Sequence, residues 1–133
     1  MAAGSAYPSR MTAKFLLCAS LLSPALALAQ TPAEILKETD TTGGLVVHLG
    51  CGDGSKTAEF LAGPGFRVHG LDKNAENVAT ARQQLLTSGN YGKIAVDRIT
   101  GSALPYGDNL VNLLVAESDE FVPHAEIVRV LVP

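Results

Sequence analysis

The sequence predicts an α/β fold, with an incomplete Rossmann-like parallel sheet of about four strands and helices flanking it. Two observations indicate this fold class. From residue 44 onward, short apolar runs typical of buried strands alternate with segments that have helical patterning. A glycine-rich bend, Gly50–Gly54, directly follows the first of these runs. Such alternation favours parallel strands joined by right-handed crossovers, and ligands of such folds bind beyond the carboxyl ends of the strands.

The chain is long enough for one domain and has an ordinary globular composition. Of its 133 residues, 47% are hydrophobic, and the formal net charge is −3. Lys and Arg form no cluster, so we expect no nucleic-acid partner. We expect residues 1–29 to be a signal peptide, 30–43 to be a linker with a short helix, and 44–133 to be the folded domain.

The first 29 residues have the pattern of a secretory signal. Arg10 and Lys14 precede an apolar run over residues 15–29, which ends in the small-x-small pattern Ala27-Leu28-Ala29. A membrane-spanning helix takes about 20 apolar residues, so this run is too short to be a stable span. The pattern predicts an exported, periplasmic protein. An uncleaved anchor and a start at Met11 are the alternatives.

The first half of the domain is expected to contain two strands around one helix. Leu45–Leu49 is almost continuously apolar, which is typical of a strand buried on both faces. After the bend, Lys56–Ala62 has a helical pattern that ends at a Gly-Pro-Gly stop. Phe66–Leu71 is the second strand, and it ends at Asp72.

The second half is expected to continue the alternation. Asn74 can cap a helix that runs to about Ser88. Lys93–Ile99 is the third strand, and Leu110–Ala116 is a fourth strand apolar enough to be central. Pro123–Leu131 is the last predicted helix.

The bend and Asp72 together predict a binding site for an adenine nucleoside. Gly50, Gly52 and Gly54 supply the residue type needed where a chain turns with positive φ or lies against a ligand. Asp72 ends the neighbouring strand, 22 residues after Gly50, where a carboxylate can accept hydrogen bonds from both ribose hydroxyls. The alternative role of Asp72 is to cap the turn that follows it.

Three ligand classes fit this bend to different degrees. A dinucleotide fingerprint requires glycine at the sixth position, which is Ser55 here. The triphosphate pattern G-x-x-x-x-G-K-S/T is approached at Ser55–Thr57, but the glycine before Lys56 is missing. S-adenosylmethionine carries no phosphate and requires a G-x-G-x-G turn with a ribose-binding acid, and both are present. An NAD- or ATP-binding domain is therefore the lesser alternative.

Four segments in the expected order resemble class I S-adenosylmethionine-dependent methyltransferases. Val46–Gly54 looks like their motif I, and Asp72 looks like the acid that follows it. Leu104–Val115 resembles their LPF-x-DNSFDLVV segment. Glu126–Pro133 resembles the E-x-x-RVLKPGG stretch, cut before its glycines. The resemblance covers residues 44–133.

The resemblance implies S-adenosylmethionine binding and methyl transfer to an unidentified acceptor. The family sheet has seven strands, so the domain is expected to be truncated at its C-terminus, with the outer edge of the fourth strand uncovered and activity weak or absent. The motifs are most similar to those of exported bacterial proteins in which such a domain precedes a quinoprotein-like β-propeller, so a C-terminal domain is expected to be missing. The non-enzymatic alternative is an exported pseudo-methyltransferase that serves as a binding or interaction module.

The family pattern also predicts the cofactor contacts. Three positions depart from it, because His48, Ser102 and Asn112 stand where the family usually has acids. No catalytic residue is assigned, because methyl transfer needs no general base. Transferred residue by residue, the pattern places the cofactor against His48, Gly50, Cys51, Gly52, Asp53, Gly54, Asp72, Lys73, Ser102, Ala103 and Glu117.

Several of these side chains also have a purely structural interpretation. His48 fits a hydrogen-bonded core histidine, Glu117 belongs to an acidic run, and Cys51 fits a small loop residue better than a reactive thiol. His69 and His124 share no metal-ligand spacing with them, so we expect no metal site.

Overall fold

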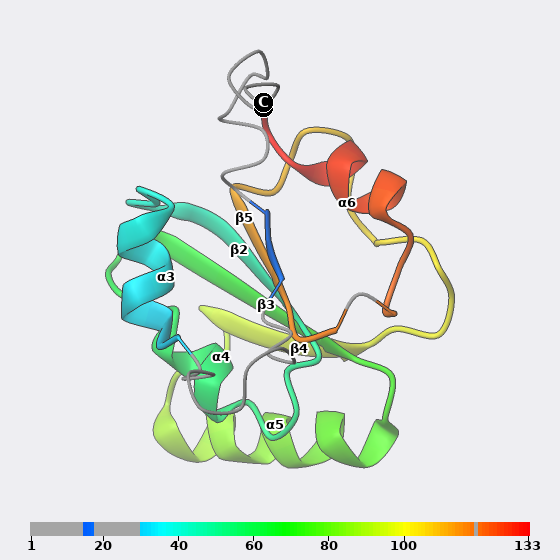
Figure 1. Ribbon diagram of the computed structural model, residues 1–133. Helices are drawn as coiled ribbons and strands as arrows, with labels where there is room; N and C mark the ends of the chain where they lie inside the picture. Colours follow the sequence, from blue (N-terminus) through cyan, green and yellow to red (C-terminus); the bar gives the residue numbers. More distant parts are fainter. Residues whose placement is uncertain (1–14, 18–29, 119) are drawn as a thin grey trace, which may run out of the picture.

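The computed structural model describes residues 15–17, 30–118 and 120–133, so most of the predicted signal peptide lies outside the described residues. Within them, parallel strands form one sheet in the order β1-β5-β2-β3-β4 (Figure 1). None of the described helices is long and apolar enough to cross a membrane. The elements are β1 (Phe15–Leu17), α3 (Pro32–Glu38), β2 (Gly44–Leu49), α4 (Ser55–Glu59), β3 (Phe66–Asp72), α5 (Ala75–Ser88), β4 (Ile94–Arg98), β5 (Leu113–Ala116) and α6 (His124–Val130).

The α/β fold and the four predicted strands are confirmed, although some strands are shorter than expected. The largest difference is at β5, which was expected to begin at Leu110. The backbone N–H groups of Leu110 and Val111 instead donate to the carbonyl of Val130, each at 2.7 Å. These bonds hold the segment against the end of α6, so the strand begins only at Leu113.

Strand β1 was not predicted, because Phe15–Leu17 lies inside the predicted signal peptide. This strand pairs in parallel register with residues 114–116 of β5. The outer edge of β5, expected to be uncovered, therefore has a backbone partner in the structure. The edge of the sheet is then a strand of three residues, and short edge strands are one way in which proteins limit edge-to-edge aggregation.

Two apolar cores lie on the two faces of the sheet. Helices α3, α4 and α5 cover one face, and α6 with the segment before β5 covers the other (Figure 1). On the first face, Ile35 of α3 and Ala81 of α5 are fully buried against Val46 of β2. On the second face, Ile127 and Val130 of α6 are buried in the cluster that also holds the apolar residues of β5 facing them. A sheet covered on both faces explains why its strands are almost wholly apolar.

The order of the strands reverses next to β2. From β2 the chain continues to β3 and β4 on one side, and then returns to β5 on the other side of β2. In open α/β sheets this reversal creates a crevice at the carboxyl ends of the two strands, where ligands bind. The fold therefore points to the carboxyl ends of β2 and β5.

The opposite end of β2 is held by Asn112. Its Oδ1 accepts a hydrogen bond from the Leu45 N–H at 2.9 Å. Gly44 has φ +96, and a Cβ there would lie only 2.2 Å from the same oxygen. Asn112, one of the departures from the family pattern, thus serves packing at the end of the sheet remote from the bend.

Candidate functional site

Three strands end at one level of the sheet. Leu49, the last residue of β2, pairs with Leu71 of β3 and with Ala116 of β5. The next residues along the three strands are Gly50, Asp72 and Glu117. The sheet register therefore gathers the bend and two carboxylates at the point where the strand order reverses.

The bend is sterically fitted to its surroundings. Gly50 has φ +84, and a Cβ there would lie 2.9 Å from the Phe121 ring and 3.1 Å from Cβ of Glu117. Gly54 has φ +85, and a Cβ there would lie 3.0 Å from that of Ala81 on α5. Glycine is required at both positions. A Cβ on Gly52, by contrast, would meet no atom within 4 Å, so the middle of the bend faces open space.

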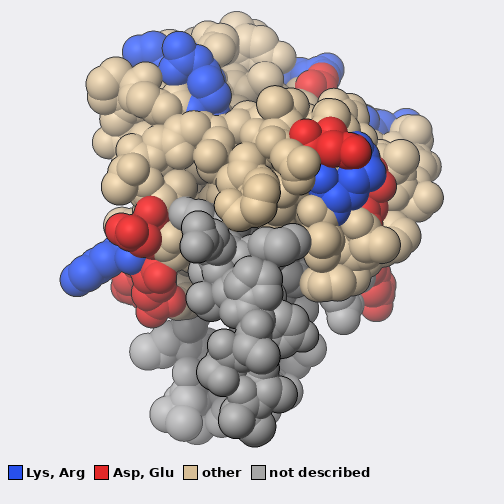
Figure 2. All heavy atoms as spheres, turned by 90° about the horizontal axis from the view of Figure 1, so that it is seen from above, with Lys and Arg blue, Asp and Glu red and all other residues tan. Residues whose placement is uncertain are grey.

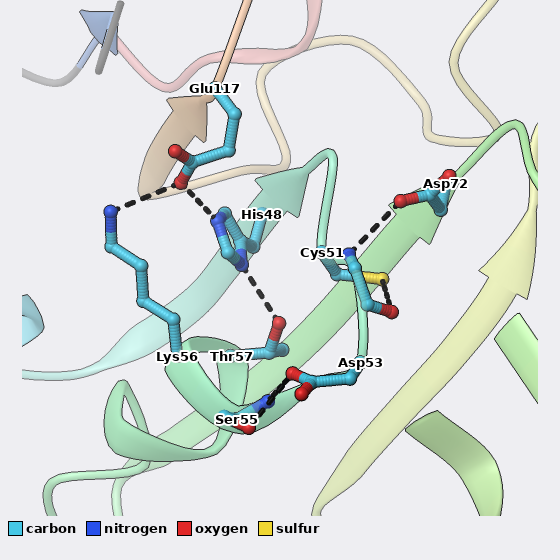
Figure 3. Close-up of polar contacts among 9 residues, drawn as sticks. His48, Cys51, Asp53, Ser55, Lys56, Thr57, Asp72 and Glu117 are labelled. Carbon is cyan, nitrogen blue, oxygen red and sulfur yellow. Dashed lines mark hydrogen bonds and ion pairs between the residues drawn. The ribbon is translucent and has the colours of Figure 1, made fainter. Parts of the chain in front are cut away.

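Asp72 contacts the bend directly. Its Oδ2 accepts a hydrogen bond from the Gly52 N–H at 3.0 Å, as Figure 3 shows, and its Oδ1 accepts from the Asn74 N–H at 2.8 Å. Asp72 is buried, with 7% of its surface exposed. The structure therefore shows the capping contact that was the alternative role, and it also places the carboxylate at the glycine bend.

Two other residues of the bend serve the loop itself. Cys51 is buried against Gly70, and burial raises the pKa of its thiol to about 12, so it is not a reactive thiolate. Asp53 is exposed and accepts hydrogen bonds from the N–H and the hydroxyl of Ser55, at 3.0 and 2.8 Å. The Ser55 bonds lower the pKa of Asp53.

A histidine–carboxylate–lysine cluster lies beside the bend (Figure 3). His48 is 1% exposed, and its Nδ1 lies 2.8 Å from Oγ1 of Thr57 while its Nε2 lies 2.6 Å from Oε2 of Glu117. Lys56 donates to the same oxygen of Glu117 at 3.1 Å. Burial opposes ionisation of Glu117, but the hydrogen bonds from His48 and Lys56 outweigh it and lower the pKa of this carboxyl.

Two residues of this cluster, His48 and Glu117, were predicted cofactor contacts, and they differ in burial. His48 is the buried, hydrogen-bonded histidine of the structural interpretation, and it reaches the surface of the bend only through Glu117. Glu117 leaves the solvated acidic run and turns toward the bend. Lys56 and Thr57 were not predicted as site residues. Lys56 meets Glu117 and so joins α4 to the end of β5, while Thr57 meets His48 of β2. No spacing along the chain could have indicated the contact between Lys56 and Glu117.

A pocket of about 450 Å³ opens between the ends of β3 and β4 and the following loop, at Leu71, the residue before Asp72. Leu71, Ile99 and Ala103 are among its lining residues. Its size falls in the range of small-molecule sites. Ser102 is exposed beside Ala103, and Lys73 lies over the Phe121 ring at 5.6 Å.

A second histidine cluster, also not predicted, lies at this pocket. His69 lines it, and Nε2 of His69 lies 2.7 Å from Oδ2 of Asp97. The other ring nitrogen of His69 bonds the hydroxyl of Tyr106, and Arg82 donates to Asp97 at 2.7 Å. Burial raises the pKa of Tyr106 well above its ordinary value, so the phenol stays protonated.

The last sequence motif holds this part of the chain in place. Glu126 accepts from the Leu104 N–H at 2.7 Å, and Arg129 donates to Glu126 and to Asp108 at 2.5 and 2.7 Å. The hydrogen bond from Arg129 lowers the pKa of Glu126 to about 2. The Glu–x–x–Arg pair thus ties α6 to the loop that borders the pocket.

Figure 2 shows positive and negative side chains interspersed over the described part of one face. Among the described residues, no group of three or more His, Cys, Asp or Glu side chains is arranged to hold a metal ion.

Comparison with solved structures places the fold among methyltransferases. A structure from Methanococcus maripaludis, proposed to be an S-adenosyl-L-methionine-dependent methyltransferase, matches with a TM-score of 0.68 at 20% identity, over 76% of this chain and 49% of that one. The (4+2)-cyclase SpnF matches with 0.67 at 23%, over 77% and 40%. A SAM-dependent methyltransferase from Aquifex aeolicus matches with 0.64 at 23%, over 77% and 58%. The chain thus spans about half the length of these structures.

The sequence itself carries the family assignment. No curated protein matches this chain. The model of a family described as a methyltransferase domain matches residues 46–133, which include the bend, Asp72 and both later motifs. This match covers more than half of the sequence, and the chain belongs to this methyltransferase-domain family.

Proposed function

We propose that the chain binds S-adenosylmethionine at the carboxyl ends of β2, β3 and β5 and transfers its methyl group to an acceptor. The observation that carries this proposal is the hydrogen bond from the Gly52 N–H to Asp72, which brings the bend and the acid together. A class I site needs both features around one adenosine. The family match supports the same cofactor.

The residues present fit the adenosine half of this cofactor. A carboxylate has about four lone-pair sites, and Asp72 uses three of them on Gly52, Asn74 and Asn77, so acceptor capacity remains for a ribose hydroxyl. The open space over Gly52 leaves room for the sugar. The adjoining pocket, which Ala103 lines, would take the adenine ring.

The protein's part in the reaction is binding and orientation. S-adenosylmethionine supplies an activated methyl on a sulfonium, so the chemical driving force belongs to the cofactor. The residues around the bend fix its position, and holding two reactants in line lowers the entropic part of the barrier. We expect the acceptor on the β5 side of the bend, beyond Glu117.

The second candidate function is ligand binding without methyl transfer, in an exported pseudo-methyltransferase. The similarity to SpnF supports it, since that protein is described as a cyclase although it shares the fold. The predicted signal peptide supports it too, because export would separate the domain from a cofactor made in the cytosol. Cleavage of this peptide would also remove β1 from the edge of the sheet. A nucleoside triphosphate is disfavoured because Ser55 stands where the phosphate-binding pattern requires a glycine before the lysine.

Isothermal titration of the full chain with S-adenosylmethionine, S-adenosylhomocysteine, NAD and ATP tests these proposals together. We expect binding of the first two ligands only. Binding of ATP that Lys56→Ala abolishes, or of NAD alone, would overturn the cofactor assignment. Transfer of a labelled methyl group from S-adenosylmethionine to extracts, compared with Asp72→Ala, then separates the enzyme from the binding module.

A further inference from the structure

We propose that the folded chain retains its own leader by using Phe15–Leu17 as strand β1, so that the leader serves either as an edge strand of the sheet or as an export signal, but not as both. The inference goes beyond the proposed function and does not depend on which ligand the bend binds. It combines the signal peptide expected at residues 1–29 with a strand that was not predicted there.

Strand β1, blue in Figure 1, completes the strand pairing of β5. Residues 114–116 pair in parallel with residues 47–49 of β2 on one side and with residues 15–17 of β1 on the other. These three residues of β5 are at most 1% exposed, and buried backbone groups need hydrogen-bond partners. Without β1, this side of β5 would have no strand partner within the described part of the chain. The folded sheet therefore favours holding the leader here.

The register makes Leu16 the central residue of this contact. Leu16 lies opposite Val115. In a parallel ladder a residue bonds the two neighbours of its opposite residue, so the register directs the N–H of Ala116 toward β1. The ladder to β2 uses the alternate residues of β5, since the Glu117 N–H donates to the Leu49 carbonyl at 3.0 Å. The two sides of β5 can therefore be altered separately.

The backbone groups of the leader cannot serve the sheet and an export partner at the same time. Phe15–Leu17 follows Lys14 directly and begins the apolar run that is expected to act as the signal. Each backbone N–H or C=O that bonds β5 is withdrawn from other partners. A leader held as β1 is therefore masked, whereas a leader bound by the export machinery leaves β5 without this strand.

The contact is short, so both outcomes are accessible. Strand β1 has three residues, and each ladder bond adds only modestly to stability, because the unfolded chain bonds to water instead. Chains that fold before export keep the leader, and chains that are exported first lose β1 when the leader is cleaved. The retained chains stay in the cytosol, where S-adenosylmethionine is made.

Cleavage of the folded full chain tests the retention. A site for a sequence-specific protease is inserted between Ala29 and Gln30, the native protein is cut, and size-exclusion chromatography with mass spectrometry detects the leader. We expect it to co-elute with the domain. Leu16→Pro removes a ladder N–H and should lower the retained fraction by about tenfold or more. Leu16→Val, which keeps the N–H and suits a strand, should retain the leader. Release from the wild type, or retention by Leu16→Pro, would overturn the inference.

Leader cleavage of the unmodified full chain in a bacterial host tests the exclusion. Ala116→Pro removes the N–H that faces β1 but changes neither the leader nor the ladder to β2. It should raise the ratio of cleaved to uncleaved chains by about twofold to tenfold, as for loss of one hydrogen bond.

Val96→Ala is the matched control, because it weakens the buried core at β4, the opposite edge of the sheet. Urea denaturation measures how far each variant is destabilised. An equal rise in cleavage for Val96→Ala at equal destabilisation would show that cleavage follows overall stability, and would overturn the inference. No rise for Ala116→Pro, or no cleavage of any variant, would overturn it too.

Discussion

Two clusters of the same chemical make-up lie in different parts of the sheet. In each, a histidine bonds a hydroxyl with one ring nitrogen and a carboxylate with the other, and the carboxylate is also paired with a cation. The first cluster consists of His48, Thr57, Glu117 and Lys56, and the second consists of His69, Tyr106, Asp97 and Arg82.

The clusters differ in burial and in place. The side chain of His48 is 2% exposed and that of His69 is 17% exposed, while Glu117 and Asp97 are 30% and 53% exposed. The first cluster adjoins the bend at the β2–β5 reversal, and the second lies across β3 and β4. The same set of side chains thus lies at the glycine bend in one place and at the pocket in the other, because the position in the sheet decides which site each cluster borders.

The largest expected difference is in stability. His48→Ala leaves the buried Thr57 hydroxyl without this partner and the Glu117 carboxylate with Lys56 alone, and should lower the free energy of unfolding by about 3 kcal/mol. His69→Ala, at a more exposed cluster, should cost about 1 kcal/mol. Urea denaturation of the full-length variants measures both. Equal losses would show that burial does not distinguish the clusters.

The next largest effect should be on how the free energy of unfolding falls at acid pH. Hydrogen bonding from His69 lowers the pKa of Asp97, and the bonds from His48 and Lys56 lower that of Glu117 against the effect of burial. A carboxyl with a depressed folded-state pKa contributes stability above its ordinary value, 3.8 for Asp or 4.5 for Glu, and loses it as the pH falls through the folded-state value.

In Asp97→Asn and in Glu117→Gln, the free energy of unfolding should therefore fall less steeply than in the wild type as the pH drops below 3.8 and 4.5, respectively. Denaturation at a series of pH values measures this. A variant whose acid limb is as steep as that of the wild type would show that its carboxylate does not titrate with folding.

The sequence predicted the parts of the fold that are coded locally. The apolar run at Leu45–Leu49 and the glycines of the bend indicate a buried strand and a turn from their own residue types. Asp72 could be placed because the end of a strand fixes its side chain near the neighbouring turn. These features depend on short stretches of chain, which periodicity describes well.

The parts that escaped prediction depend on distant contacts. His48 and Glu117 meet only because β5 returns beside β2, and Tyr106 meets His69 only because a long loop folds back over β3. Neither pairing leaves a spacing signal in the sequence. Strand β1 was missed for a different reason, since its apolar residues fit a signal peptide as well as a strand.

The second cluster should have a smaller effect, and this effect should be on ligand affinity, the same for ligands with and without the amino-acid end of the cofactor. Asp97 lines the pocket next to Asp72, at the expected adenine end. Asp97→Asn should therefore change the affinities for S-adenosylhomocysteine and 5′-methylthioadenosine by the same factor, at most about fivefold, because its ion pairs are exposed. Titration of both ligands checks this. A lower affinity for S-adenosylhomocysteine alone would place Asp97 at the amino-acid end of the cofactor instead of the adenine end.

The smallest expected effect is that of Arg82, the cation of the second cluster. Arg82 and Asp97 are about half exposed, so Arg82→Gln should lower the free energy of unfolding by less than about 1 kcal/mol. Urea denaturation at low and high salt measures it. A larger loss that persists at high salt would mean that this ion pair is screened from solvent more than its exposure indicates.

The central claim is that the glycine bend and Asp72 together bind an adenosine, and titration calorimetry of 5′-methylthioadenosine against the wild type and Asp72→Asn tests it most directly. Asparagine keeps an oxygen for the Gly52 N–H but removes the charge and half of the acceptor capacity. The account predicts saturable binding by the wild type and an affinity lower by about tenfold or more in the variant. Equal affinity in the two proteins, or no binding by the wild type, would contradict it.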